Sequence, residues 1–177
     1  LLSVSELLPD GHTGNLYDES EGKLAAPKNV RTLADIISLS STIRRRSITV
    51  DFVTPTRLQY DGFLVEELTF PVFWAAVSRR ISLLCSLYAQ FPCSADWDYL
   101  HTLSHQVSVR ATNVKWFDWE RYSKRQGARM PLGGLKGAVE FEGPLSAFMP
   151  WLAAGQMLHV GKNSAFGLGK YRIHHED

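Results

Sequence analysis

The stretch Ser47-Ile48-Thr49-Val50-Asp51-Phe52 alternates polar and apolar side chains residue by residue. Ile48, Val50 and Phe52 therefore share one face, and this period of two predicts a strand that is buried on that side. The pattern runs on to Thr54 and Pro55, where the proline predicts a bulge or the end of the strand. We take this strand as the first element of the expected domain.

A long helix is predicted after this strand, starting at Phe70 and closed by Pro92. Its apolar residues recur at steps of three and four, as the inward face of a helix requires. They extend over about five turns at 3.6 residues per turn, and Pro71 suits the first turn. The apolar stripe consists of Phe70, Phe73, Trp74, Val77, Ile81, Leu84, Cys85 and Tyr88.

The order of the remaining elements predicts the fold. Alternation indicates strands over residues 107–117 and 135–142, and a short helix is expected within 95–106. A second helix begins at Gly143-Pro144 with Gly155 as its C-terminal cap, and a strand over 169–173 follows. Strand–helix–strand–strand–helix–strand is the split βαβ arrangement. We therefore expect an α+β, ferredoxin-like (βαββαβ) domain with one antiparallel sheet and two helices on one face.

Length and composition limit the class of protein. The chain has 177 residues, of which 45% are hydrophobic and 21% charged, and these ordinary globular values exclude wholesale disorder. The expected ferredoxin-like domain covers residues 44–177, while residues 1–43 are expected to be the tail of a preceding N-terminal domain plus a linker. Because the sequence does not begin with Met, we expect a piece of a longer protein.

Two cysteines, Cys85 and Cys93, are too few for a disulfide scaffold and lack the spacing of a zinc site. The opening residues have no basic leader, and no apolar run approaches the roughly 20 residues that span a bilayer. We therefore expect a cytoplasmic protein that does not associate with a membrane.

Positive charge is concentrated in one segment. Residues 110–136 hold seven basic and two acidic residues, interleaved with Trp116 and Trp119. Basic side chains contact phosphates and aromatic rings stack on bases, so this composition is typical of RNA binding, although a solvated pair of strands explains it equally well. Guanidinium forks also suit phosphates and guanine edges. The predicted RNA contacts in this segment are Arg121, Tyr122, Lys124 and Arg125.

The stretch Gly161-Lys162-Asn163-Ser164-Ala165-Phe166-Gly167-Leu168-Gly169-Lys170 is the second candidate site. Glycines allow positive φ angles and let backbone N–H groups approach an anion. The spacing fits neither a Walker loop nor a dinucleotide fingerprint. We expect a cradle for RNA phosphates or bases, and the alternative is a tight turn into the last strand. The residues predicted to form the cradle are Gly161, Lys162, Gly167, Gly169 and Lys170.

No catalytic set stands out in the sequence. His159 precedes the glycine-rich loop and is the candidate general acid or base, because imidazole titrates near neutral pH. A lone histidine is more often structural. His101 and His105 could share a helix face as metal ligands, but no third ligand accompanies them, so neither a metal nor another cofactor is expected.

Several motifs resemble one known family, and they occur in the right order. They are Phe52-Val53-Thr54-Pro55-Thr56-Arg57-Leu58, Arg79-Arg80-Ile81-Ser82-Leu83-Leu84, Arg121-Tyr122-Ser123-Lys124-Arg125-Gln126, Leu132-Gly133-Gly134-Leu135-Lys136-Gly137, and Leu158-His159-Val160-Gly161-Lys162 with Phe166-Gly167-Leu168-Gly169-Lys170-Tyr171. Over about residues 45–173 the chain resembles the C-terminal domain of the CRISPR-associated endoribonuclease that processes repeat RNA, Cas protein six of the RAMP superfamily.

The resemblance implies two tandem ferredoxin-like domains in the whole protein. It also implies binding of the repeat hairpin of CRISPR precursor RNA and one metal-independent cut per repeat, in which the RNA's own 2′-hydroxyl attacks the adjacent phosphate. The family's catalytic histidine commonly lies in the N-terminal domain, so no residue here matches it. Two alternatives stay open: a non-catalytic structural subunit of a CRISPR effector complex, and a generic protein-interaction domain.

Overall fold

The computed structural model describes residues 5–7, 13–18, 20, 22–27, 32, 35–36, 38, 45–89, 95–123 and 127–174. The chain divides into two compact units, Leu1–Asp35 and Ile36–Asp177. The expectation that residues 1–43 are a domain tail plus a linker stays a prediction. The first unit contains two small antiparallel ladders. The ladders join β1 (Ser5–Leu7) to β2 (Thr13–Asn15) and β3 (Tyr17–Asp18) to β4 (Lys23–Leu24).

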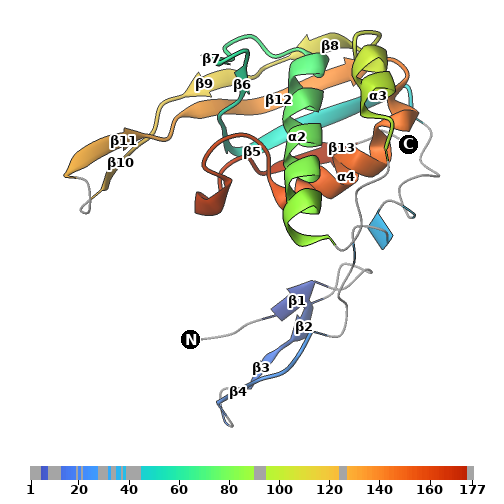
Figure 1. Cartoon of the computed structure of the whole chain (residues 1–177). Coiled ribbons are helices and arrows are strands. Elements are labelled where there is room, and N and C mark those ends of the chain that lie inside the picture. The colour runs from blue at the N-terminus through green and yellow to red at the C-terminus, as the bar shows by residue number, and fades with distance from the viewer. Residues whose placement is uncertain are drawn as a thin grey trace. The chain divides into compact units, whose positions relative to one another are not determined.

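A five-stranded antiparallel sheet is the frame of the second unit (Figure 1). The strands run in the order β13-β5-β12-β8, and β9 pairs with the first three residues of β12. In the sequence, helices lie between β5 and β8 and between β12 and β13. Together with the strand order of the sheet, this arrangement confirms the predicted ferredoxin-like class. The strands are β5 (Ser47–Thr56), β8 (Ser108–Thr112), β9 (Lys115–Phe117), β12 (Gly134–Glu142) and β13 (Tyr171–His174).

Helices α2 (Phe70–Tyr88) and α4 (Met149–Leu158) pack against each other on one face of the sheet, and α3 (Trp97–Ser104) packs beside α2. Most of the predicted stripe of α2 is buried in the core, but Leu84 is half-buried and Tyr88 is exposed. The ring of Phe73 lies 5.6 Å from that of Phe52 and 5.0 Å from that of Tyr171. By length and composition alone α2 would also qualify as a membrane span, but its apolar stripe is buried against the sheet.

The central strands depart from regular pairing at two places. The register between β12 and β5 shifts between Leu135 and Gly137, and the amides of Val53 and Thr54 both donate to the carbonyl of Lys170, so the bulge predicted near Pro55 is confirmed. The strand predicted over 107–117 is broken into β8 and β9. Asn113 lies at the break, where its side-chain oxygen accepts a 2.6 Å hydrogen bond from the Ala138 amide.

The C-terminal half of the fold differs from the prediction at Gly155. This residue lies inside α4, not at its C-terminus. A glycine suits the position because the Tyr171 hydroxyl occupies the space where a Cβ would stand. The helix ends instead at His159, which has a φ of 57°. A 3-10 turn, η1 (Leu145–Ala147), precedes α4, and another, η2 (Ser164–Phe166), lies in the glycine-rich loop.

Two hairpins extend beyond the main sheet. One joins β6 (Gln59–Tyr60) to β7 (Phe63–Leu64), and the other joins β10 (Glu120–Ser123) to β11 (Ala128–Pro131). We call the second hairpin, together with β9 and the first residues of β12, the arm: residues 115–123 and 127–137. The arm projects away from the helices, toward the left in Figure 1.

Candidate nucleic-acid interface

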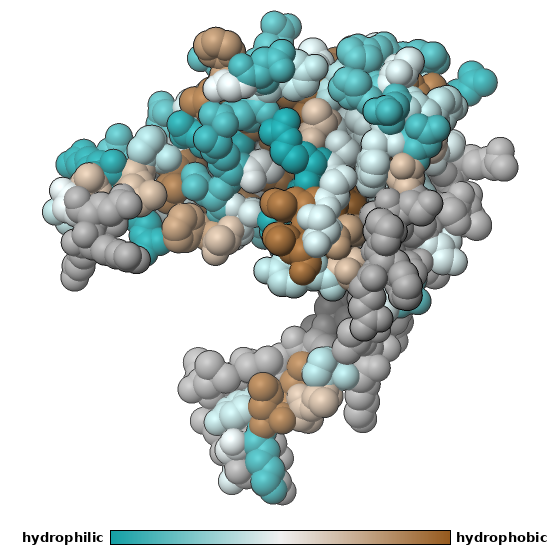
Figure 2. All heavy atoms as spheres, viewed as in Figure 1, coloured by the Kyte–Doolittle hydropathy of each residue, from teal (hydrophilic) through white to brown (hydrophobic). Residues whose placement is uncertain are grey.

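The arm carries basic and aromatic side chains close together. Figure 2 shows hydrophilic and hydrophobic residues interleaved along it. The Lys136 ammonium lies 5.2 Å from the centre of the Phe117 ring, and Lys136 stands directly opposite Lys115 in the β9–β12 register. Like charges directly opposite each other destabilise a strand pair, so a nearby anion would stabilise this exposed position.

The predicted contacts on the hairpin are exposed where the structure describes them. Arg121 and Tyr122 lie on β10, and the Tyr122 ring is 61% exposed. Lys124 and Arg125 fall outside the described residues, and their role stays a prediction. Arg129 on β11 forms an exposed ion pair with Glu120 at 3.4 Å.

The glycine-rich loop is shaped by close packing of its backbone. A Cβ at Gly161 would lie 2.5 Å from the Arg57 carbonyl oxygen, and one at Gly169 would overlap the Val160 carbonyl. Both glycines have positive φ angles, 80° and 77°. Glycine is therefore required at these two positions by space as well as by backbone conformation.

Several of the loop's amides already donate hydrogen bonds inside the chain, which differs from the expected phosphate cradle. A backbone cradle needs N–H groups that point outward, and these point inward. The side chains of Lys162 and Lys170 remain as the charged groups that the loop offers to RNA. The internal bonds run from Lys162 N to Arg57 O (2.9 Å), from Gly167 N to Ser164 O (3.0 Å), from Gly169 N to Pro55 O (3.1 Å) and from Lys170 N to Thr54 Oγ1 (2.9 Å).

The two candidate stretches meet in space. The guanidinium carbon of Arg121 lies 5.4 Å from the centre of the Phe166 ring, so the hairpin contacts the tip of the glycine-rich loop through a cation–π interaction. Phe166 is 50% exposed. The arm and the loop therefore present one continuous surface, although they are separate in the sequence.

Arg57 also contacts both the arm and the glycine-rich loop, although the sequence alone predicted no role for it. Its Nη1 donates to the carbonyl oxygens of Pro131 and Gly133 in the arm, at 3.4 and 3.3 Å. Its own carbonyl accepts the Lys162 amide of the loop. The available signal was its place in the Thr-Pro-x-Arg-Leu motif, where an arginine directly follows a strand.

His159 supports the loop. Its Nδ1 lies 3.1 Å from the Leu168 carbonyl oxygen, and the ring is half-buried. The neighbouring Leu158 carbonyl accepts a hydrogen bond from Arg80 Nε at 3.1 Å. Within the described part of the chain, no three His, Cys, Asp or Glu side chains gather closely enough to hold a metal ion.

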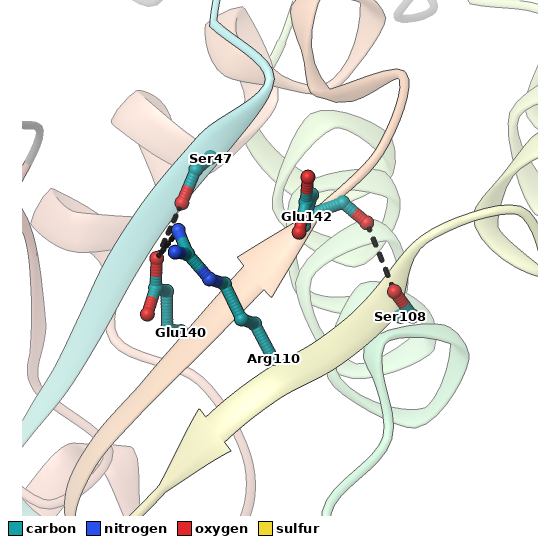
Figure 3. Close-up of polar contacts among 5 residues, drawn as sticks. All are labelled: Ser47, Ser108, Arg110, Glu140 and Glu142. Atoms are coloured by element: carbon teal, nitrogen blue, oxygen red, sulfur yellow. Dashed lines mark hydrogen bonds and ion pairs between the residues drawn. The ribbon is translucent and has the colours of Figure 1, made fainter.

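The sheet face opposite the helices is polar. Figure 3 shows Glu140 accepting hydrogen bonds at Oε1 from Ser47 Oγ at 2.8 Å and from Arg110 Nη1 at 2.9 Å. The pairing register places small, polar and acidic residues on this face of β5 and β12: Ser47, Thr49, Asp51, Ala138, Glu140 and Glu142. These side chains offer no stacking platform for bases. The arm and the loop, in contrast, carry exposed aromatic residues, namely Phe117, Trp119, Tyr122 and Phe166.

Fold and site together define a ferredoxin-like domain with a basic, aromatic arm that contacts a glycine-rich loop. Residues 50–171 match the family model of the CRISPR-associated endoribonuclease Cas6, and the chain belongs to this family. No curated protein matches the sequence closely enough to count as a relative.

Solved structures share the fold at low sequence identity. The chain is similar to Thermus thermophilus Cas6 with 15% identity and a TM-score of 0.62, covering 88% of this chain and 62% of that one. It is similar to a Cas6 product complex with 14% identity and a TM-score of 0.63, covering 95% and 60%. It is also similar to a chain of a partial Cas6-RT-Cas1–Cas2 complex with 14% identity and a TM-score of 0.61, covering 93% of this chain and 30% of that one. The chain thus spans less than two thirds of these Cas6 chains.

Proposed function

We propose that this chain is the C-terminal, RNA-binding part of an endoribonuclease that cuts precursor CRISPR RNA within its repeats to give guide RNAs. The observation that carries the proposal is the contact of Arg121 with Phe166, which unites the arm and the loop in one basic, aromatic surface. Lys115, Lys136 and Lys162 add charge to this surface, as binding of a phosphate backbone requires. Membership of the Cas6 family is the reason for choosing CRISPR RNA as the substrate class.

The proposed cut needs no metal. The 2′-oxygen of one nucleotide attacks the adjacent phosphorus, the bond from phosphorus to the 5′-oxygen breaks, and a proton moves from the 2′-hydroxyl to the leaving oxygen. A 2′,3′-cyclic phosphate and a 5′-hydroxyl result. Proton transfer by side chains and charge stabilisation on the phosphorane are the two demands on the protein.

His159 Nδ1 is hydrogen-bonded to the Leu168 carbonyl within the loop, which leaves Nε2 for any proton transfer, so His159 stays a secondary candidate for the general acid or base. We expect the principal catalytic histidine outside this chain, in the N-terminal domain of the whole protein. The 177-residue chain alone should therefore bind repeat RNA and cut it poorly. A cytoplasmic location without membrane association completes the proposal, since the precursor RNA is made there.

The test is a cleavage assay of the full-length protein on its cognate repeat RNA in the presence of EDTA. We expect a single cut that leaves a 2′,3′-cyclic phosphate, and a 2′-deoxy nucleotide at the cut site should abolish it. Cleavage that stops on EDTA addition would overturn the metal-independent mechanism. Tight repeat binding with no cleavage under any condition would favour the structural-subunit alternative, and sequence-blind weak binding would favour a protein-interaction domain.

A further inference from the structure

A hollow of about 290 Å³ lies where the arm leaves the sheet. Trp116, Trp119 and Arg57 line it. Asp118 and Glu120 also line it, and Glu120 Oε2 forms an exposed ion pair with Arg129 Nη1 at 3.4 Å. Neither the metal-independent chemistry nor the phosphate contacts proposed above use this hollow.

The walls of the hollow are fixed by contacts inside the chain. The Trp116 indole N–H donates a 2.8 Å hydrogen bond to Asp118 Oδ1, and the Arg57 guanidinium lies 5.8 Å from the centre of the Trp116 ring. The backbone of Trp119 is tied to the arm by a 2.7 Å hydrogen bond from the amide of Leu132, which is buried. The site is therefore formed before any ligand arrives.

Gly133 also lines the hollow, and its lack of a side chain is required by the space around it. A Cβ there would lie 2.8 Å from the Phe117 carbonyl oxygen and 3.3 Å from the Trp116 indole nitrogen. The arm backbone and the Trp116 indole therefore lie close together at Gly133. Trp119 is 43% exposed, so a ligand in the hollow can contact it.

The chemistry of the lining suits a nucleobase and disfavours a phosphate. Indole faces and guanidinium planes stack on unpaired bases. Two carboxylates repel a phosphate but accept hydrogen bonds from the amino groups of adenine, cytosine or guanine. Although Asp118 Oδ1 already accepts the Trp116 N–H, an ionised carboxylate has about four lone-pair sites and keeps capacity for more donors.

We propose that this hollow binds one unpaired nucleobase of the RNA, which stacks on Trp119 and donates its amino group to Asp118 or Glu120. The site thereby prefers adenine, cytosine or guanine over uracil at one position. The inference rests on the proposed function, since it names the part of the RNA that this surface reads.

The test uses the 177-residue chain and three fluorescein-labelled RNA probes with equal numbers of phosphates: a decamer of A, a decamer of U, and an abasic decamer. We expect the A decamer to bind more tightly than the other two. Trp119→Ala should weaken binding of the A decamer about tenfold and leave the abasic decamer unchanged, and Trp119→Phe should restore part of the loss.

Two further variants sharpen the result. Asp118→Asn replaces an acceptor by an amide that also donates, so the preference for A over U should shrink. Tyr99→Ala removes another exposed aromatic ring, 57% exposed on α3 and outside the arm, and should change nothing. Unchanged binding of the abasic probe also shows that each variant is folded.

The outcomes separate this inference from the proposed function. Equal binding of the A decamer and the abasic decamer would overturn the base site while leaving RNA binding intact. An equal loss for all three probes in Trp119→Ala would assign Trp119 a purely structural role and overturn it as well. No binding of any probe by the unmodified chain would overturn both proposals.

Discussion

Tyr171 is fully buried under α4, and its hydroxyl donates a 2.6 Å hydrogen bond to the Leu152 carbonyl. Burial disfavours the phenolate and raises the pKa of Tyr171 well above its ordinary value. The same group in the unfolded chain titrates near 10, so above that pH the unfolded state loses the proton first. The contribution of Tyr171 to the free energy of unfolding is therefore complete below about pH 10 and declines as the pH rises further.

We expect chemical unfolding measured from pH 8 to pH 11 to show this decline, and Tyr171→Phe to make it shallower. Tyr99→Phe is the matched control, because the Tyr99 ring is exposed. An identical slope in Tyr171→Phe and in the unmodified chain would contradict the assignment.

Gly155 faces the same hydroxyl from within α4. Alanine is the better helix former by about 1 kcal/mol, yet Gly155→Ala should lower the free energy of unfolding by about 1–3 kcal/mol, because the new Cβ would collide with the Tyr171 hydroxyl. Adding Tyr171→Phe removes the colliding oxygen and should restore part of the loss. A double-mutant cycle by urea unfolding measures this coupling, and simple additivity of the two changes would rule out the collision.

At the scale of elements, Arg57 ties the arm to the end of β5. Arg57→Ala removes two hydrogen bonds to arm carbonyls and the contact with Trp116. We expect backbone amides of β11 to exchange with deuterium about fivefold faster, as the loss of roughly 1 kcal/mol of local stability predicts. Arg57→Lys should not restore protection, because a lysine lacks the planar fork.

The control for the arm is Arg129→Ala. Arg129 also lies in the arm, but its ion pair with Glu120 is exposed on both sides, at 79% and 57% of the side chains. Exposed pairs contribute little to stability, so exchange should stay unchanged. If both variants accelerated exchange equally, Arg57 would have no special part in holding the arm.

At the scale of the whole molecule, the arm and loop should bind RNA through its phosphates. Each phosphate contact adds about one unit to the slope of log affinity against log salt. Arg121→Ala and Lys162→Ala should each weaken binding of the cognate repeat and reduce this slope by about one, as should Arg125→Ala. Filter binding at several salt concentrations measures this slope.

Arg110→Ala is the matched control for charge. Arg110 belongs to the same basic stretch of sequence, but its guanidinium is paired with Glu140 on the polar sheet face. The salt slope should therefore keep its value in this variant. A slope that falls equally for Arg110→Ala and Arg121→Ala would mean that net charge, and not the arm and loop surface, sets the affinity.

Much of the fold was predictable because amphipathic periodicity is a local property. The apolar stripe from Phe70 to Cys85 specified α2, and the alternation around Val50 specified β5. Tyr88, predicted on the same stripe, is 80% exposed at the C-terminal end of α2. Gly155 was taken for a helix end because its real partner, Tyr171, lies on a different element.

By itself the sequence determined the order of the main strands and helices, the Cas6 resemblance and the two stretches rich in glycine and basic residues, but not the β6–β7 hairpin or the break between β8 and β9. Only the tertiary structure decided that Arg121 reaches Phe166, that Arg57 joins arm to loop, that several of the loop's amides donate inward and that two tryptophans line a hollow. Periodicity and composition depend on near neighbours along the chain, whereas these contacts join residues that meet only once the sheet has assembled.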